Sequence, residues 1–290
     1  MGLFDFLRSK KPSAPQPLPS SPSGAPRFTV DRTRMFDLGE TAQLAQLFAT
    51  PADQRGDAWC DAFFDHVWNA SVVMADPPEF VAPDGFRYLR LSLPRPNAPF
   101  ESQSLANLAG TCVERLSGAV IFASPDDPID APQYVLSLGL LESLRLYDSW
   151  RGDPIDIAES TGKDDATHFT VEEEAAGLRA LTVTASHEVL TGSPSPSFLS
   201  PAMARGLTAY MTNIWGIDYP HVHLLVDAKM RPSRNLVIGR KRSDFVSEED
   251  AQSEMRRIFW FLPPLRAVIL MPDHWQESDM TPLSQLSGEG

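Results

Sequence analysis

The sequence lacks the patterns that usually identify an enzyme or a membrane protein. It has no G-x-S-x-G elbow, no G-x-x-x-x-G-K-[ST] phosphate loop, no H-E-x-x-H motif and no G-x-G-x-x-G after an expected strand. No apolar run approaches the roughly 20 residues that a transmembrane helix needs. The opening MGLFDFLRSKK has its charges after the apolar stretch and no cleavage site, which is not typical of a secretory signal. We therefore expect a cytoplasmic, non-enzymatic protein that holds no cofactor.

Cysteine is also scarce, with Cys60 and Cys112 as the two in the chain. Two cysteines cannot build a disulfide framework, and neither stands in a C-x-x-C pair. Cys112 falls on the apolar stripe of an expected helix, where it is typical of a small core residue. We expect two free thiols in a reducing compartment.

Positive charge is in deficit, because 25 Lys and Arg face 38 Asp and Glu for a formal net charge of −13 and a pI of about 4.9. Nucleic acid is a dense polyanion, so an acidic protein binds it only through a locally basic face. The balance disfavours nucleic acid as a partner and is typical of a protein that stays dispersed. The hydrophobic fraction of 42% is enough for a globular core.

Composition divides the chain into four parts. Residues 1–27 contain a proline-rich stretch that cannot bury enough surface to fold, and we predict that they are disordered. Residues 28–160 and 166–274 are predicted to form two α+β domains, with an acidic boundary around 152–165. The polar, acidic residues 275–290 are predicted to form a disordered tail.

Apolar spacing predicts the elements of the first domain. The expected helices are 38–48, 51–67, 105–116 and 140–147, and the expected strands are 71–74, 86–93, 119–123 and 134–138. The helix over 51–67 is expected to start at Thr50, a capping hydroxyl followed by proline.

The second domain is expected to run β-α-β-β-α-β. Its predicted strands are 187–190, 222–226, 235–239 and 267–270, with helices that begin after Ser200 and Ser247. Three carboxylates follow Ser247, where the helix dipole favours negative charge. This order is the split βαβ pattern of ferredoxin-like domains, which predicts two helices on one face of an antiparallel sheet.

The same region resembles a known family. The segments VLTGSPSPSFLSPAMARGLTAYM, HVHLLVDAKMRPSRNLVIGRKRSDF and EMRRIFWFLPPLRAVILMP are similar to the C-terminal domain of SseB-like (enhanced serine sensitivity) proteins, where a G-x-P step also leads from a strand into a helix. The segments FDHVWNASVVM and GFRYLRLSLP are loosely similar to that family's N-terminal domain, so the resemblance covers residues 37 to 272. The proline-rich leader and the acidic residues 152–175 depart from it. The resemblance implies no catalytic residue for this chain.

The first eleven residues combine an apolar hook with a basic collar. The hook consists of Leu3, Phe4, Phe6 and Leu7, and the collar of Arg8, Lys10 and Lys11. On a flexible linker, such a segment can dock in a groove of a partner or on an anionic membrane surface. The alternative is a frayed terminus without a partner.

A second candidate is a basic hairpin in the second domain, made of Lys229, Arg231, Arg234, Arg240, Lys241 and Arg242. In an acidic chain, this concentration of cations favours a site for a phosphate-bearing ligand, RNA or an acidic protein. The alternative is an edge hairpin whose charges prevent pairing with other sheets. No aromatic residues interleave with the cations, so a protein partner is favoured over nucleic acid.

The pair His221 and His223 is a weak metal candidate. On a strand, residues two apart point to the same face, so both imidazoles can reach one ion, with Asp218, Asp227 and His187 as further ligands. The alternative is a pair of histidines at a solvated strand start after Pro220.

Three functions remain open from the sequence. The favoured one is a non-enzymatic interaction or regulatory protein that docks a protein partner through the hook and the basic hairpin. The alternatives are a metal-dependent hydrolase built on His221 and His223, and a small-molecule sensor that binds a metabolite at an interface. The run Phe259, Trp260 and Phe261 is expected to direct at least one ring at the other domain or at a partner.

Overall fold

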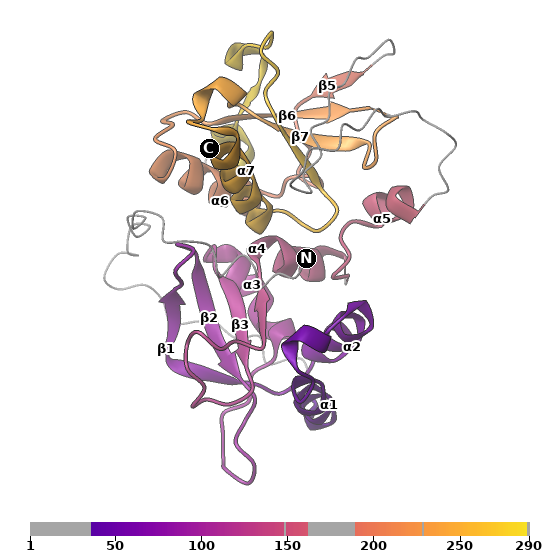
Figure 1. The fold of residues 1–290 in the computed structure, drawn as a ribbon, viewed down its shortest axis with the longest axis vertical. Coiled ribbons are helices and arrows are strands. Elements are labelled where there is room, and N and C mark those ends of the chain that lie inside the picture. The colour runs from indigo at the N-terminus through magenta and orange to yellow at the C-terminus, as the bar shows by residue number, and fades with distance from the viewer. Residues whose placement is uncertain (1–35, 148, 162–188, 228, 289–290) are drawn as a thin grey trace.

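The computed structural model describes residues 36–147, 149–161, 189–227 and 229–288. They form two mixed sheets, one from each half of the chain, with helices between them and at their sides (Figure 1). This architecture confirms the predicted α+β class. None of the helices in these ranges has the length and apolar content that a bilayer crossing requires.

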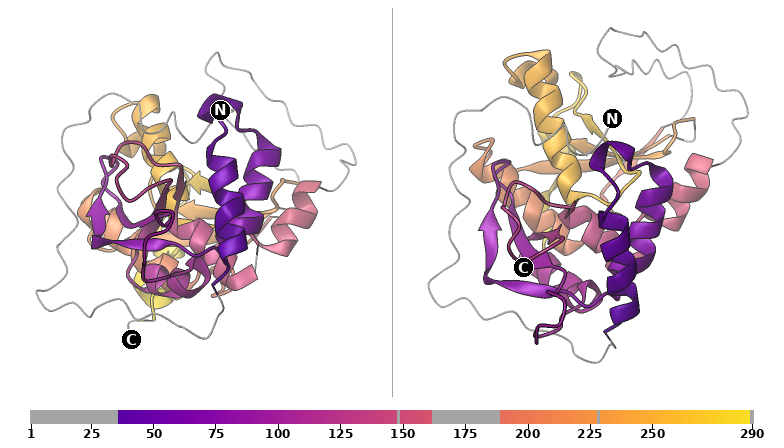
Figure 2. Two further views of the ribbon diagram at one scale, coloured as in Figure 1. Left: turned by 90° about the horizontal axis from the view of Figure 1, so that it is seen from below. Right: turned by 60° about the horizontal axis from the view of Figure 1, so that its bottom comes forward.

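The first half builds a four-stranded sheet in the order β1-β2-β3-β4. Its elements are the helices α1 (Leu38–Phe48), α2 (Asp57–Val67), α3 (Leu105–Glu114) and α4 (Leu138–Tyr147), the 3-10 helix η2 (Ala52–Gln54), and the strands β1 (Val73–Val81), β2 (Arg87–Ser92), β3 (Gly118–Phe122) and β4 (Tyr134–Leu136). β1 and β4 run antiparallel to their neighbours, whereas β2 and β3 are parallel. Helices α1 and α2 lie side by side next to this sheet (Figures 1 and 2).

The second half builds a sheet in the order β5-β6-β7-β8, with β9 paired to β6. Its strands are β5 (Leu190–Gly192), β6 (His221–Val226), β7 (Arg234–Ile238), β8 (Ala267–Leu270) and β9 (Thr281–Pro282). Its helices are α6 (Pro201–Asn213), α7 (Glu248–Ile258), α8 (Leu283–Leu286) and the 3-10 helices η3 (Arg242–Asp244), η4 (Phe259–Phe261) and η5 (Glu277–Asp279). Helix α5 (Pro154–Thr161) follows the first half and lies beside the second sheet (Figure 1).

The helix starts show why the sequence patterns work. Ser247 accepts a hydrogen bond from the backbone N–H of Asp250 at 3.1 Å, and Ser200 accepts one from Met203, as predicted for both caps. The first turn of α7 is acidic and its last turn basic, which matches the helix dipole. The predicted start at Thr50 is wrong: α2 begins at Asp57, because Arg55 donates to the carbonyls of Thr50 and Gln133 and ties the preceding segment into a 3-10 turn.

The ferredoxin-like arrangement is not what the second sheet shows. The elements follow one another as β-α-β-β-α-β, but β7 and β8 are parallel neighbours, so the sheet is mixed rather than antiparallel. Helix α7 is the crossover that returns the chain to run beside β7 in the same direction. Sequence periodicity predicts elements but not which strands become neighbours.

The prediction of a disordered tail over residues 275–290 is also wrong. Residues 281–286 form β9 and α8, and only 289–290 lie outside the described part of this segment. Met280 and Leu283 are buried, and the backbone N–H of Leu283 donates to Pro220 at 2.9 Å. These two apolar anchors hold an otherwise polar segment against the second sheet.

One continuous apolar cluster joins the two halves. It contains Phe63, Leu91 and Leu141 from the first half together with Val222 and Leu236 from the second. The division into two domains at the predicted boundaries therefore stays a prediction.

A pair of helical glycines tests the contact between the halves. Gly139 lies in α4, and a methyl group there would collide with the backbone of Leu262, which belongs to the second half. We expect Gly139→Ala to lower the free energy of unfolding by about 2–4 kcal/mol through overpacking. The matched Gly110→Ala in α3 meets no atom within 4 Å and is expected to raise it by about 0.5–1 kcal/mol. Urea unfolding followed by circular dichroism measures both, and equal effects would contradict the close α4 contact.

Candidate functional site

The seam between the two halves is centred on the ring of Trp260. Its indole stacks on Phe86 with ring centroids 4.3 Å apart and an interplanar angle of 4°. Its Nε1–H donates a hydrogen bond to the hydroxyl of Tyr88 at 2.9 Å. Phe261 is also buried, while Phe259 is 45% exposed. The expectation that the aromatic run packs across the two halves is confirmed for Trp260.

Two carboxyl groups extend this seam into a polar network. The hydroxyl of Tyr88 donates to Asp84 at 2.7 Å, and burial raises the pKa of Asp84 although this hydrogen bond opposes the shift. Across α6, Tyr210 and the indole N–H of Trp215 both donate to Glu254 at 2.7 Å. Each carboxyl group accepts hydrogen bonds from donors of its own half, so these bonds fix the two sides of the seam separately. The hydrogen bond from Trp260 to Tyr88 is the one that links the two sides.

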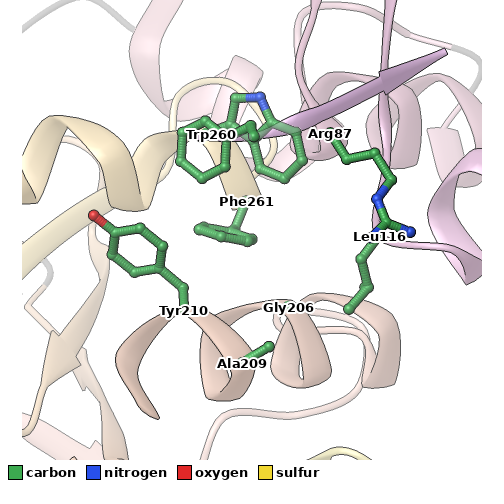
Figure 3. Close-up of a pocket in the computed structure, with 8 residues that line it drawn as sticks. Arg87, Leu116, Gly206, Ala209, Tyr210, Trp260 and Phe261 are labelled. Atoms are coloured by element: carbon green, nitrogen blue, oxygen red, sulfur yellow. The ribbon is translucent and has the colours of Figure 1, made fainter. Parts of the chain in front are cut away.

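A small apolar niche lies between the halves (Figure 3). It is lined by Phe86, Arg87, Leu116, Gly206, Ala209, Tyr210, Trp260 and Phe261. Figure 3 shows the ring of Trp260 on one side and helix α6 on the other, with Phe261 pointing into the space between them. Its volume of about 20 Å³ is close to that of a single water site. In this form the niche has no room for a metabolite of the kind that the sensor hypothesis requires.

The basic hairpin occupies the middle of the second sheet. β7 pairs with β6 on one side and with β8 on the other, so the explanation by edge protection is wrong. The six cations also divide between the two ends of β7. Lys229, Arg231 and Arg234 lie at its start, whereas Arg240, Lys241 and Arg242 follow its end.

Arg234 is not available for a partner in this structure. Its guanidinium forms ion pairs with Asp156 at 2.5 Å and with Asp153 at 3.2 Å. Arg266 joins the same cluster, and its side chain is almost fully buried. Sequence reasoning missed this cluster because it treated residues 152–165 only as an acidic boundary. The signal was the pair of carboxylates three residues apart at the start of α5.

The cations after β7 have partners of a different kind. The guanidinium of Arg240 lies 3.9 Å from the ring centroid of Phe245 and 4.9 Å from that of Trp215. Lys241 donates to the carbonyl of Asp273 at 2.7 Å, and Arg242 pairs with Glu248. Phe245 is only five residues from Arg240, but Trp215 comes from the segment after α6, so local sequence spacing could not reveal the contact with Trp215.

Two large apolar side chains are exposed at this same end of the sheet. Tyr219, just before β6, is 80% exposed, and Val246, next to Phe245, is 98% exposed. The backbone N–H of Gly239 donates to the carbonyl of His221 at 2.9 Å, which places the start of β6 beside the end of β7. Tyr219, Val246 and Arg240 therefore belong to neighbouring loops, which we call the β6–β7 end surface.

The histidine pair does not form a recognisable metal centre. His221 and His223 follow the alternation of β6, and the Nδ1 atom of each is buried without a hydrogen-bond partner. Of the other candidate ligands, Asp227 caps the next loop by accepting from the N–H of Lys229, and Asp218 is exposed. In the part of the chain that the structure describes, no three His, Cys, Asp or Glu side chains converge.

Some predicted features lie outside the described residues. These are the hook residues Leu3, Phe4, Phe6 and Leu7, the predicted disordered residues 1–27, and His187. Comparison with protein-family models, with curated proteins and with solved structures found no match to this chain. The resemblance to SseB-like proteins therefore stays a prediction.

His223 provides a test of the outer face of the second sheet. Burial against Trp275 lowers the pKa of His223, and Asp279 offsets this only in part. A histidine whose pKa is lowered by folding stabilises the fold above its unfolded pKa of about 6.5 and loses that contribution as the pH falls below it. We expect His223→Gln to reduce the loss of unfolding free energy between about pH 7.5 and about pH 5.5.

The matched control is His274→Gln, which changes an exposed histidine on the adjacent segment. Urea midpoints at the two pH values measure the effect. The assignment fails if both variants show the same acid sensitivity as the unchanged chain.

Proposed function

We propose that this chain is a non-enzymatic protein-binding protein that docks a partner on the β6–β7 end surface. The observation that carries the proposal is the exposure of Tyr219 and Val246 on loops next to that of Arg240, whose guanidinium lies over the rings of Trp215 and Phe245. Tyrosine and arginine are the residue types that most often dominate binding energy at protein interfaces. An arginine already fixed by stacking loses little side-chain entropy when a partner binds.

The other cations at this end extend the surface with positive charge. Lys241 and Arg242 keep their charged groups at the periphery, where exposed charges mainly affect the association rate and the choice of partner. Acidic side chains are present here as well, including Asp244 and Glu248. The proposal therefore assigns most of the binding energy to the apolar and aromatic residues rather than to net charge.

The apolar hook is the second proposed anchor. Leu3, Phe4, Phe6 and Leu7 precede the proline-rich stretch that the sequence predicts to be a flexible linker. A tethered second contact raises avidity without enlarging the first surface. As a secondary proposal, residues 1–11 contact an anionic membrane surface instead of a protein groove. Membership of the SseB-like family would agree with a binding role, and the proposal does not depend on it.

Affinity capture from lysate of the source cell tests the proposal. We expect the double variant Tyr219→Ser with Val246→Asp to recover at least about tenfold less of a specific partner than the unchanged chain, because truncation of anchor residues costs more than 1 kcal/mol each. A chain that starts at Phe28 measures the hook separately. Charge reversal at Arg240 and Arg242 measures the cationic contribution.

The control variant is Ile129→Asp, which alters a side chain in the first half that is 52% exposed. It is expected to leave capture unchanged. Recovery of the same proteins in the same amounts by all variants would refute the proposed surface.

A further inference from the structure

A compact group of two arginines and one aromatic ring lies at the start of β7 and β8. Asn235 pairs with Ala267 in the parallel ladder, so the residues before them, Arg234 and Arg266, are also neighbours across the sheet. The ring of Phe198 lies against both guanidinium groups, with its centroid 5.5 Å from that of Arg234 and 4.4 Å from that of Arg266. Two adjacent guanidinium groups on an aromatic base are a favourable geometry for carboxylates.

The carboxylates that meet these arginines come from another part of the chain. Asp153 directly precedes α5 and Asp156 lies in its first turn, before the second sheet begins. Asp156 forms ion pairs with Arg234 at 2.5 Å and with Arg266 at 3.4 Å. Asp153 forms ion pairs with the same two arginines at 3.2 and 3.4 Å. The two aspartates are almost fully buried, whereas Ile155 between them is 55% exposed. The segment therefore inserts its acidic side chains and leaves its apolar one in solvent.

The fit of Arg266 to these carboxylates is incomplete. Its exposed fraction is 3%, yet its Nη1 has no hydrogen-bond partner. Its Nη2 is divided among Tyr147, Ser197 and Asp153 at 3.0 to 3.4 Å. A well-matched pair of arginine and carboxylate makes two parallel bonds of about 2.7–2.9 Å, and a buried donor without an acceptor is costly. The arginine pair has more donor capacity than Asp153 and Asp156 use.

We propose that Arg234, Arg266 and Phe198 form a receptor for an acidic peptide segment, which Asp153 and Asp156 occupy in cis. The ligand class is a peptide with two carboxylates three residues apart, since this is the spacing of the internal occupant. A partner segment of this kind displaces the start of α5 and takes its place on the arginines. The receptor lies at the opposite end of β7 from the β6–β7 end surface, and it does not rest on the function proposed for that surface.

Binding of the chain's own segment in trans tests the receptor. The probe is a fluorescent peptide of residues 151–161, RGDPIDIAEST, and the control peptide has asparagine at both aspartate positions. The protein is the full chain with Asp153→Asn and Asp156→Asn, which weakens the internal occupant. We expect this variant to bind the acidic peptide at least about tenfold more tightly than the unchanged chain, where the tethered occupant competes at an effective concentration of order mM. Added Arg266→Met is expected to abolish binding.

Fluorescence anisotropy measures binding, and far-UV circular dichroism shows whether each variant is folded. A folded double variant that does not bind the acidic peptide, or binds both peptides equally, overturns the proposal and leaves the cluster as a fixed brace. If the double variant does not fold, Asp153→Asn alone decides: Asp156 still pairs with both arginines and supports the fold, while the two ion pairs of Asp153 are lost, so this variant is expected to bind the acidic peptide more tightly than the unchanged chain. Binding by that single variant supports the receptor, and its failure to fold or to bind overturns it. Loss of partner capture by the Tyr219 and Val246 variant is measured independently of either result.

Discussion

The seam between the two sheets depends on the indole of Trp260, which stacks on Phe86 and donates a hydrogen bond to Tyr88. Trp260 lies in η4, directly after α7, and the next residue but one, Leu262, packs its backbone against Gly139 of α4. One short segment of the second half therefore supplies both the buried ring and the backbone contact that close the seam. Burial of a large aromatic side chain contributes several kcal/mol, so loss of this ring affects both halves at once.

The two halves that meet at the seam have the same order of elements. Each half contains a helix, an antiparallel pair of strands, a crossover helix and a strand parallel to the second member of the pair. In the first half these elements are α2, β1, β2, α3 and β3, and in the second half they are α6, β6, β7, α7 and β8. In each case the crossover helix buries its apolar side chains in the shared core, among them Leu108 of α3 and Ile258 of α7. The seam thus joins two layers with a similar order of elements. Its residues do not all occupy equivalent positions in the two layers.

The sequence predicted most elements because local rules decide them. Fourfold apolar spacing located α2 and α3, and a serine followed by three carboxylates located α7. Contacts between residues far apart in the chain decide the order of strands in the second sheet, the partners of Arg234 and the approach of Trp215 to Arg240. No local pattern carries that information. The last segment was missed for a different reason: Met280 and Leu283 are too few to form a periodic pattern, yet two buried anchors are enough to hold it.

The buried ion cluster separates two explanations for Arg234 and Arg266, the arginines at the start of β7 and β8. If their purpose were stability alone, apolar side chains at the positions of Arg234 and Arg266 would serve equally well, because desolvation of a buried ion pair often cancels its attraction. Charged side chains provide a selectivity that apolar packing cannot, because they favour carboxylates at a particular spacing. Asp153 and Asp156 supply these carboxylates here, while the Nη1 atom of Arg266 has no hydrogen-bond partner. A site that selects carboxylates but is not saturated by its own chain is better suited to exchange of acidic segments than to permanent bracing.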